Sequence, residues 1–272
     1  MIASASLLRE ATQAIPLAEA EFLLATLLRV PRYLLYLDTG PVPAHHTARF
    51  RTLVRQAAAG VPVQYLVRSA PFLNFELYVD RRVLIPRPET EELVLRAAAR
   101  VRLPRLVVDY GTGSGCIAIA LARLFPRSRI IAVDSSSAAL RVCRRNANSH
   151  GFGSRLKLVR AESLSAPPLR RLAGRVDLLI SNPPYVPAER IQRLSPSVRD
   201  FEPLSGLDGG RKGTKILAML LKLGPSLLSR QGLLAIEVDS THAGFVTRHA
   251  PCAEIERDLS GRTRYAFLSL CT

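Results

Sequence analysis

A glycine-rich turn, VVDYGTGSGCIAIALA (residues 107–122), joins an apolar strand pattern to a helical pattern. Glycines at positions 111, 113 and 115 let backbone N–H groups approach a ligand at the amino end of a helix. Asp134 ends the next strand pattern, where a carboxylate can accept hydrogen bonds from both hydroxyls of a ribose. The spacing D-x-G-x-G-x-G departs from the dinucleotide fingerprint, which would need glycine where this chain has Cys116. The turn therefore predicts a site for a nucleoside-type cofactor and argues against a dehydrogenase.

A second candidate stretch is SNPPYVP (residues 181–187), which follows the apolar run VDLLI. Prolines lack an N–H and fix φ, so they end a strand and stiffen the loop that follows. A rigid loop explains Pro183 and Pro184. It does not explain the amide of Asn182 or the ring of Tyr185, and these two residue types indicate a functional loop.

Both stretches lie in a region where apolar strand patterns alternate with helical patterns. The strand candidates are residues 105–109, 129–134, 156–159, 176–180, 233–238, 253–258 and 264–270. Nearly continuous apolar strands separated by helices predict a parallel sheet covered on both faces. The last two candidates are separated only by LSGRT, which is too short for a helical crossover, so the final strand is expected to be antiparallel.

The residues before this region have a different organisation. The first 70 residues carry only helical patterns and predict a small bundle. FELYV (75–79) and RVLI (82–85) alternate in polarity and predict a hairpin turning at Asp80-Arg81. Thr90 is expected to cap a helix that begins at Glu91. We therefore expect a helical bundle over residues 1–70, a hairpin linker over 71–88 and an α/β domain over 89–272.

The chain has 272 residues and a formal net charge of +16, carried mostly by arginine. This charge favours an anionic partner such as nucleic acid or an acidic protein, although compositional drift in a GC-rich genome would also produce arginines spread along the chain. No apolar run approaches the ~18 residues of a membrane span. No histidine or cysteine spacing is typical of a metal site. We expect a cytoplasmic protein with no metal, no membrane association and free thiols at its four cysteines.

The glycine turn followed by Asn-Pro-Pro-Tyr resembles the class I S-adenosylmethionine-dependent methyltransferases that methylate a planar amino or amide nitrogen. The resemblance implies a Rossmann-like α/β domain with a seven-stranded, mostly parallel sheet. An amide nitrogen is a poor nucleophile because its lone pair is delocalised into the carbonyl. The Asn182 side-chain oxygen and the Pro183 carbonyl can accept its two N–H protons, which aims the nitrogen and favours its developing positive charge. Tyr185 offers a face for stacking.

Three further stretches, GVPVQYL (60–66), PFLNFEL (71–77) and VLIPRPETEELV (83–94), resemble the HemK/PrmC family. Members of that family methylate the glutamine of the Gly-Gly-Gln motif in peptide-chain release factors. The resemblance covers nearly the whole chain and implies a monomer whose helical bundle recognises the factor. Nucleic-acid adenine methyltransferases share Asn-Pro-Pro-Tyr but lack LIPRPETE. That activity, and a non-catalytic S-adenosylmethionine-binding module, are the alternatives.

Carried over by position, the resemblance implies three overlapping sets of residues. The catalytic set is Asn182, Pro183 and Tyr185. The cofactor set is Asp109, Gly111, Thr112, Gly113, Ser114, Gly115, Asp134, Ser163 and Asn182. The substrate set is Asn182, Pro183, Pro184, Tyr185, Arg87, Glu89 and Thr90. For Asp109 two roles stay open, because it either serves the cofactor by orienting loop amides or meeting a cationic group, or only caps the loop.

Several positions depart from the family pattern. Tyr110 replaces a small aliphatic residue inside the glycine motif, and Ser163 stands where an aromatic residue often packs on adenine. Arg211-Lys212, Asp239 and His242 also differ. These changes suggest a divergent member with altered affinity, whereas the catalytic signature is intact.

Overall fold

The computed structural model describes residues 3–37 and 41–270. The chain divides into two compact units. One unit contains the residues up to Ser69 together with Ser195–Phe201, and the other contains Ala70–Leu194 and the residues from Glu202 onward. The sequence patterns gave no sign that residues 195–201 join the first unit.

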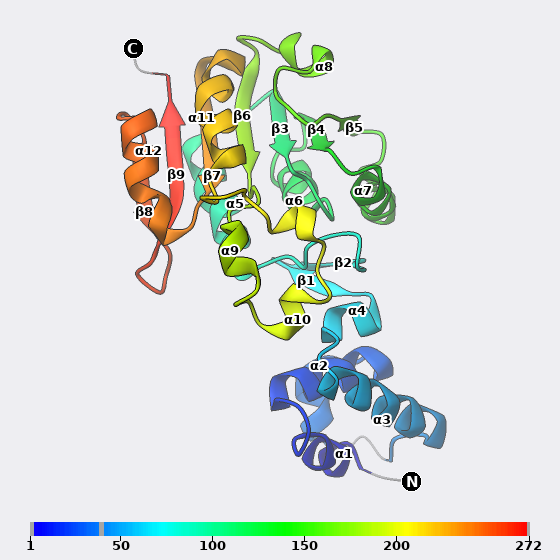
Figure 1. The fold of residues 1–272 in the computed structure, drawn as a ribbon. Coiled ribbons are helices and arrows are strands. Elements are labelled where there is room, and N and C mark those ends of the chain that lie inside the picture. The colour runs from blue at the N-terminus through cyan, green and yellow to red at the C-terminus, as the bar shows by residue number, and fades with distance from the viewer. Residues whose placement is uncertain (1–2, 38–40, 271–272) are drawn as a thin grey trace. The chain divides into compact units, whose positions relative to one another are not determined.

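The first unit is mainly helical and has its own hydrophobic core, in which Leu23, Phe50 and Leu53 are buried. Its helices are α1 Ser4–Ala11, α2 Leu17–Leu28, the 3-10 helix η1 Arg32–Tyr36, α3 Ala44–Ala58, α4 Val63–Val67 and the short α10 Pro196–Arg199 (Figure 1). The predicted N-terminal helical region is therefore confirmed.

The second unit is built on a seven-stranded sheet in the order β5-β4-β3-β6-β7-β9-β8. Its strands are β3 Leu106–Tyr110, β4 Arg129–Asp134, β5 Leu156–Arg160, β6 Val176–Ser181, β7 Leu228–Glu237, β8 Glu254–Arg257 and β9 Thr263–Ser269. The five strands from β5 to β7 in this order are mutually parallel, whereas β9 is antiparallel to both of its neighbours. The predicted fold class, with its antiparallel last strand, is confirmed.

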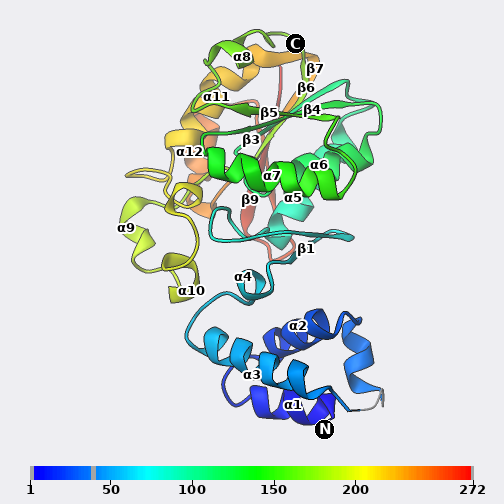
Figure 2. The ribbon, with the colours of Figure 1, turned by 90° about the vertical axis from the view of Figure 1, so that its right-hand side faces the viewer.

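Helices cover both faces of this sheet and form a separate hydrophobic core on each (Figure 2). One face packs against α5 Pro88–Arg100, α6 Cys116–Leu124 and α7 Ser137–Ser149. The other face packs against α8 Pro167–Arg170, α11 Lys215–Leu227 and α12 Ala243–His249. The connections also hold α9 Ala188–Ile191, η2 Leu204–Gly206 and η3 Ser240–His242. Burial on both faces explains why the strands read as nearly continuous apolar runs.

The hairpin exists, but the predicted pairing of residues 75–79 with 82–85 is wrong. Strand β1 Ala70–Phe72 pairs with β2 Phe75–Leu77 instead, and the chain turns at Leu73-Asn74. Residues 82–85 form no strand. The Val83 N–H closes a turn onto the carbonyl of Asp80 at 3.1 Å, and the Ile85 N–H donates to the carboxylate of Glu202 at 3.2 Å. These donors are therefore not available to a strand partner.

The described cysteines differ in their state. Cys116 and Cys143 are free and buried, and burial raises the pKa of both thiols to about 12. Cys252 is disulfide-bonded, so the expectation of a free thiol is wrong there, and Cys271 lies outside the described residues. Within residues 3–37 and 41–270, no helix is both long and apolar enough to cross a membrane.

Candidate active site

A pocket of about 740 Å³ lies at the carboxyl ends of β3, β4 and β6. In a parallel sheet these ends share one edge, where ligands of open α/β folds bind. The walls of the pocket come from the glycine loop 111–114, from residues 82–87 and from residues 203–206. The volume lies in the range of pockets that enclose small molecules.

The glycine loop adopts a backbone that only glycine takes without strain. Gly111, Gly113 and Gly115 all have positive φ, at 78°, 54° and 86°. A Cβ on Gly115 would also come within 2.8 Å of the Cys143 sulfur. The loop is tied to β4, because the N–H groups of Gly111 and Thr112 both donate to the carbonyl of Val133, at 2.8 and 2.9 Å. These constraints fix the loop over the start of α6.

Asp109 supports the loop from below. It is fully buried, and its Oδ2 accepts hydrogen bonds from the Thr112 hydroxyl at 2.6 Å and from the Ala118 N–H at 3.2 Å. Burial raises the pKa of Asp109 to about 7. These contacts favour the structural role that the sequence left open, although Oδ1 has no partner among the described residues.

Asp134 lies on the pocket wall at the end of β4. Its Oδ2 accepts from the Gly113 N–H at 3.0 Å, and its Oδ1 accepts from the Ser136 N–H at 2.8 Å. Each carboxylate oxygen has a second lone pair, so the group can still accept from the hydroxyls of a ribose. Burial raises the pKa of Asp134. The loop, the acid and the size of the pocket together fit a nucleoside-type cofactor.

The Asn-Pro-Pro-Tyr loop leaves the end of β6, and the side chain of Asn182 is fixed there by a hydrogen bond. Its Nδ2 donates to the hydroxyl of Thr90 at 2.8 Å. That hydroxyl donates in turn to Glu237 Oε2 at 2.7 Å, and the Tyr185 hydroxyl donates to Glu237 Oε1 at 3.2 Å. Asn182, Pro183 and Pro184 line the pocket.

The structure places most of the sequence-predicted site residues around this one pocket. Those on its lining are Arg87, Thr90, Gly111, Thr112, Gly113, Ser114, Asp134, Ser163, Asn182, Pro183 and Pro184. Four predicted residues are not part of the lining: Asp109 and Gly115 support the loop, the Tyr185 hydroxyl contacts Glu237, and Glu89 lies in the first turn of α5.

The prediction that Thr90 caps α5 is wrong. The helix begins at Pro88, with Arg87 at the N-cap, and Thr90 lies in its first turn with only 2% of its surface exposed. Its hydroxyl therefore points to Glu237 and Asn182. Arg87 forms an ion pair with the buried Glu202 and so closes one side of the pocket wall.

Two residues near the site were not given a role from the sequence. Glu237 is 1% exposed, and burial raises its pKa to about 7. Its signal was present, because an acid ends the apolar run LLAIE as Asp134 ends RIIAVD. Tyr110 lines the pocket, and its hydroxyl donates to the carbonyl of Glu162 at 2.9 Å. Its side chain thus links the glycine motif to the segment that carries Ser163.

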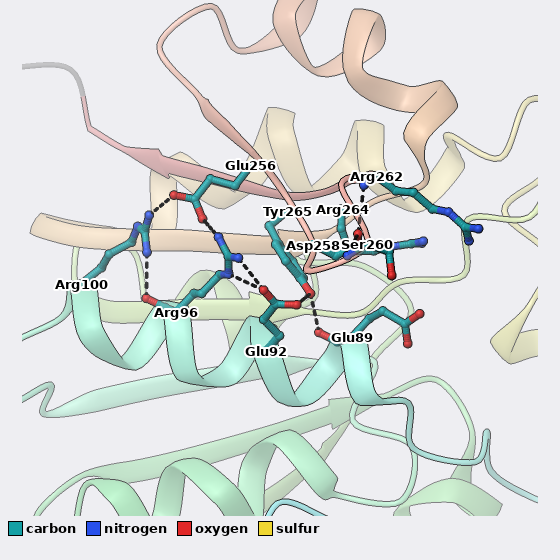
Figure 3. Close-up of polar contacts among 10 residues, drawn as sticks. All are labelled: Glu89, Glu92, Arg96, Arg100, Glu256, Asp258, Ser260, Arg262, Arg264 and Tyr265. Carbon is teal, nitrogen blue, oxygen red and sulfur yellow. Dashed lines mark hydrogen bonds and ion pairs between the residues drawn. The ribbon is translucent and has the colours of Figure 1, made fainter.

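Helix α5, which carries Thr90, is anchored to the antiparallel strands of the sheet (Figure 3). The Tyr265 hydroxyl lies 3.0 Å from the carbonyl of Glu89 and 2.9 Å from a carboxylate oxygen of Glu92. Further along the helix, Arg96 and Arg100 both form ion pairs with Glu256 on β8. The first turn of α5 therefore cannot shift without breaking buried or half-buried polar contacts.

The topology of the sheet, with a glycine loop and a strand-end acid at its carboxyl edge, defines a class I methyltransferase. Residues 91–194 match the methyltransferase small domain, and residues 2–67 match the PrmC N-terminal domain. The chain is 40% identical to the release factor glutamine methyltransferase of Chlorobaculum tepidum, over 85% of this chain and 81% of that protein. It is 36% identical to the enzyme of the same name from Mycolicibacterium smegmatis, over 97% of this chain and 94% of that protein. The chain belongs to the release factor glutamine methyltransferase family.

Among solved structures, the hMettl16 catalytic domain in complex with a 3'UTR hairpin matches with a TM-score of 0.56. The match covers 84% of this chain and 83% of that one at 13% identity, so it shows the fold alone. Methyltransferases of this class take their methyl group from S-adenosylmethionine, which is the cofactor of this family member.

Proposed function

We propose that this enzyme transfers a methyl group from S-adenosylmethionine to the side-chain amide nitrogen of the glutamine in the Gly-Gly-Gln motif of peptide-chain release factors. Family membership supports the substrate. The observation that carries the chemistry is the orientation of Asn182 on the pocket wall. Because its amide nitrogen is engaged by Thr90, its side-chain oxygen is the atom left to accept a hydrogen bond.

The cofactor half of the site is formed by the loop 111–115 and Asp134. In this proposal the Asp134 carboxylate accepts from the ribose hydroxyls, and the backbone N–H groups of the loop hold the rest of the cofactor. Ser163 lies beside the cofactor, and Asp109 serves it by holding the loop in place. When bound, S-adenosylmethionine supplies an electrophilic methyl group on a sulfonium. Asn182 lies where it can contact both this group and the substrate.

The substrate half of the site orients a weak nucleophile. The Asn182 side-chain oxygen and the Pro183 backbone carbonyl accept the two N–H protons of the glutamine amide, which holds the nitrogen near an attack distance of ~3–3.5 Å. The same acceptors stabilise the positive charge that develops on the nitrogen. Tyr185 stacks on the flat amide, and Pro184 keeps the loop rigid. A methylated, cationic amide is very acidic, so no strong general base is needed.

The rest of the chain provides recognition. We assign factor recognition to the helical residues 1–70, a linking role to residues 71–88 and the chemistry to residues 89–272, with Arg87, Glu89 and Thr90 closing the substrate side. The enzyme acts as a monomer in the cytoplasm in this proposal, and nucleic acid is not its substrate. The net charge of +16 steers an acidic factor domain toward the enzyme.

The test is transfer of labelled methyl groups to a release-factor domain that bears Gly-Gly-Gln. A Gly-Gly-Ala version of the domain and duplex DNA serve as alternative acceptors. We expect label on the Gly-Gly-Gln version alone, and a loss of about 100-fold in kcat for Asn182→Ala. Asn74→Ala, at the exposed turn of the hairpin, is the matched control and should retain the wild-type rate. Label on DNA and not on the factor domain would overturn the proposal.

A further inference from the structure

Glu237 connects the two side chains that carry the proposed chemistry, although it does not line the pocket. One carboxylate oxygen accepts from the Tyr185 hydroxyl at 3.2 Å. The other accepts from the Thr90 hydroxyl at 2.7 Å, and that hydroxyl accepts from the Asn182 amide at 2.8 Å. Glu237 and Thr90 are 1% and 2% exposed, so water does not compete for these contacts.

The direction of this chain of hydrogen bonds follows from the chemistry of its members. An ionised carboxylate can only accept, so it takes the single proton of the Thr90 hydroxyl. The hydroxyl oxygen can then only accept from its other neighbour, which must present N–H and not C=O. Asn182 therefore faces Thr90 with Nδ2 and turns Oδ1 the other way. A neutral acid at position 237 could donate to Thr90 and would remove this constraint.

The surroundings of Glu237 hold it in place. Burial has the largest influence on its pKa and raises it to about 7, so the carboxylate is mainly ionised above that pH. The Thr90 hydroxyl and Arg264, whose side chain is 11% exposed and paired with Asp258 at 3.2 Å, act against burial and lower this pKa, whereas Glu89 raises it further. On the neighbouring strand, Tyr265 stands opposite Glu237 and anchors the first turn of α5 (Figure 3). The donor Thr90 and the acceptor Glu237 are thus fixed by one set of buried contacts.

We propose that Glu237 is a positioning residue that, through the Thr90 hydroxyl, sets which atom of the Asn182 amide faces the substrate, and that also fixes the Tyr185 ring. The inference rests on the proposed function and adds a residue that does not itself touch the reacting groups. It differs from a purely structural role because it concerns the orientation of one amide and not the stability of the fold.

The test uses the full-length enzyme and isosteric variants. Thr90→Val removes the hydroxyl at nearly constant volume. Glu237→Gln replaces one acceptor oxygen of the carboxylate with an NH₂ group, which donates hydrogen bonds. We expect kcat on the Gly-Gly-Gln domain to fall about 10- to 100-fold in both, with KM and the Kd for S-adenosylmethionine unchanged within about twofold. Thr90→Ser keeps the hydroxyl and should recover most of the lost kcat. Thr247→Val, at an exposed site on α12, is the matched control.

A second measurement keeps the inference separate from the proposed function. The side-chain NH₂ signals of Asn182 in ¹H–¹⁵N spectra, assigned with Asn182→Ala, should shift in Thr90→Val and in Glu237→Gln but not in Thr247→Val. A wild-type enzyme that fails to methylate the factor domain would refute the proposed function, while these signals would still report on the hydrogen bonds. Unchanged Asn182 signals, or equal losses in Thr90→Val and Thr90→Ser, would overturn the role of Glu237.

Discussion

The α-carbon of Gly213 packs directly against the backbone carbonyl of Tyr185, so closely that a Cβ at position 213 would overlap the carbonyl oxygen. Gly213 also has a φ of 71°. The same loop pairs with the chain just beyond the motif, where the Val186 N–H donates to the carbonyl of Leu207 at 2.9 Å. The segment 207–213, whose Asp208 also lines the pocket, therefore supports the Asn-Pro-Pro-Tyr loop.

From this contact we expect Gly213→Ala to damage both stability and activity. The substitution forces a left-handed backbone on alanine and pushes a methyl group into Tyr185, which should lower the unfolding free energy by about 1–3 kcal/mol. Displacement of the loop should lower kcat more than it weakens cofactor binding. Urea unfolding and methyl-transfer kinetics measure the two effects. Gly244→Ala is the control, because a Cβ there meets nothing and alanine favours the helix.

Asp134→Asn tests the cofactor half of the site. The carboxylate already accepts from the N–H groups of Gly113 and Ser136, and an amide has only one oxygen to replace its two. We expect the Kd for S-adenosylmethionine to rise by about tenfold, by calorimetry, because one charge-assisted ribose contact is lost. Asp177→Asn is the matched control. Its carboxylate also accepts from backbone N–H groups, those of Arg105 and Leu106, but at the amino ends of the strands. Equal losses of affinity in both variants would argue against a cofactor role for Asp134.

Local sequence signals were sufficient to predict the site residues that stand at strand ends. The glycine loop, Asp134 and Asn182 each sit at a strand end with a recognisable neighbour pattern, so the sheet brings them to one edge. Glu237 carries the same signal but was missed. Its partner Thr90 lies 147 residues away, and only the position of α5 against β7 brings the two together.

The sequence-based predictions that proved wrong also have specific structural causes. The alternation in residues 82–85 indicates a strand, but their N–H groups are taken by a turn and by Glu202, so they form part of the pocket wall. The true strand Ala70–Phe72 contains Pro71, which pattern rules place only at sheet edges, as it is in this two-stranded hairpin. Thr90 was predicted to cap a helix because Ser and Thr favour the N-cap position. Its hydroxyl instead donates to the buried carboxylate of Glu237.

Tyr265→Phe tests whether α5 must be anchored for catalysis. The substitution removes only the hydroxyl that contacts Glu89 and Glu92, and leaves the ring in the core. We expect a loss of about 1–3 kcal/mol in unfolding free energy, because the buried acceptors lose a donor. We also expect a several-fold fall in kcat, because Thr90 sits in the anchored turn. Leu268→Ala, on the same strand but in the hydrophobic core of the other sheet face, should lower stability while leaving kcat and KM as in the wild type.

The dependence of stability on pH provides an independent test of the state of Glu237. Its pKa is raised from 4.5 to about 7, chiefly by burial, so between these values the folded state binds a proton that the unfolded state has released. Unfolding free energy should therefore fall as pH rises from 4.5 to about 7, and this contribution should be constant above that range. Glu237→Gln removes the titrating group. Asp109, whose pKa is also raised to about 7, remains in both proteins and cancels in the comparison. The variant should become more stable relative to the wild type as pH increases, in urea titrations at pH 5, 6, 7 and 8, even though its kcat is lower. A stability difference that does not vary with pH would mean that Glu237 keeps an ordinary pKa in the folded protein.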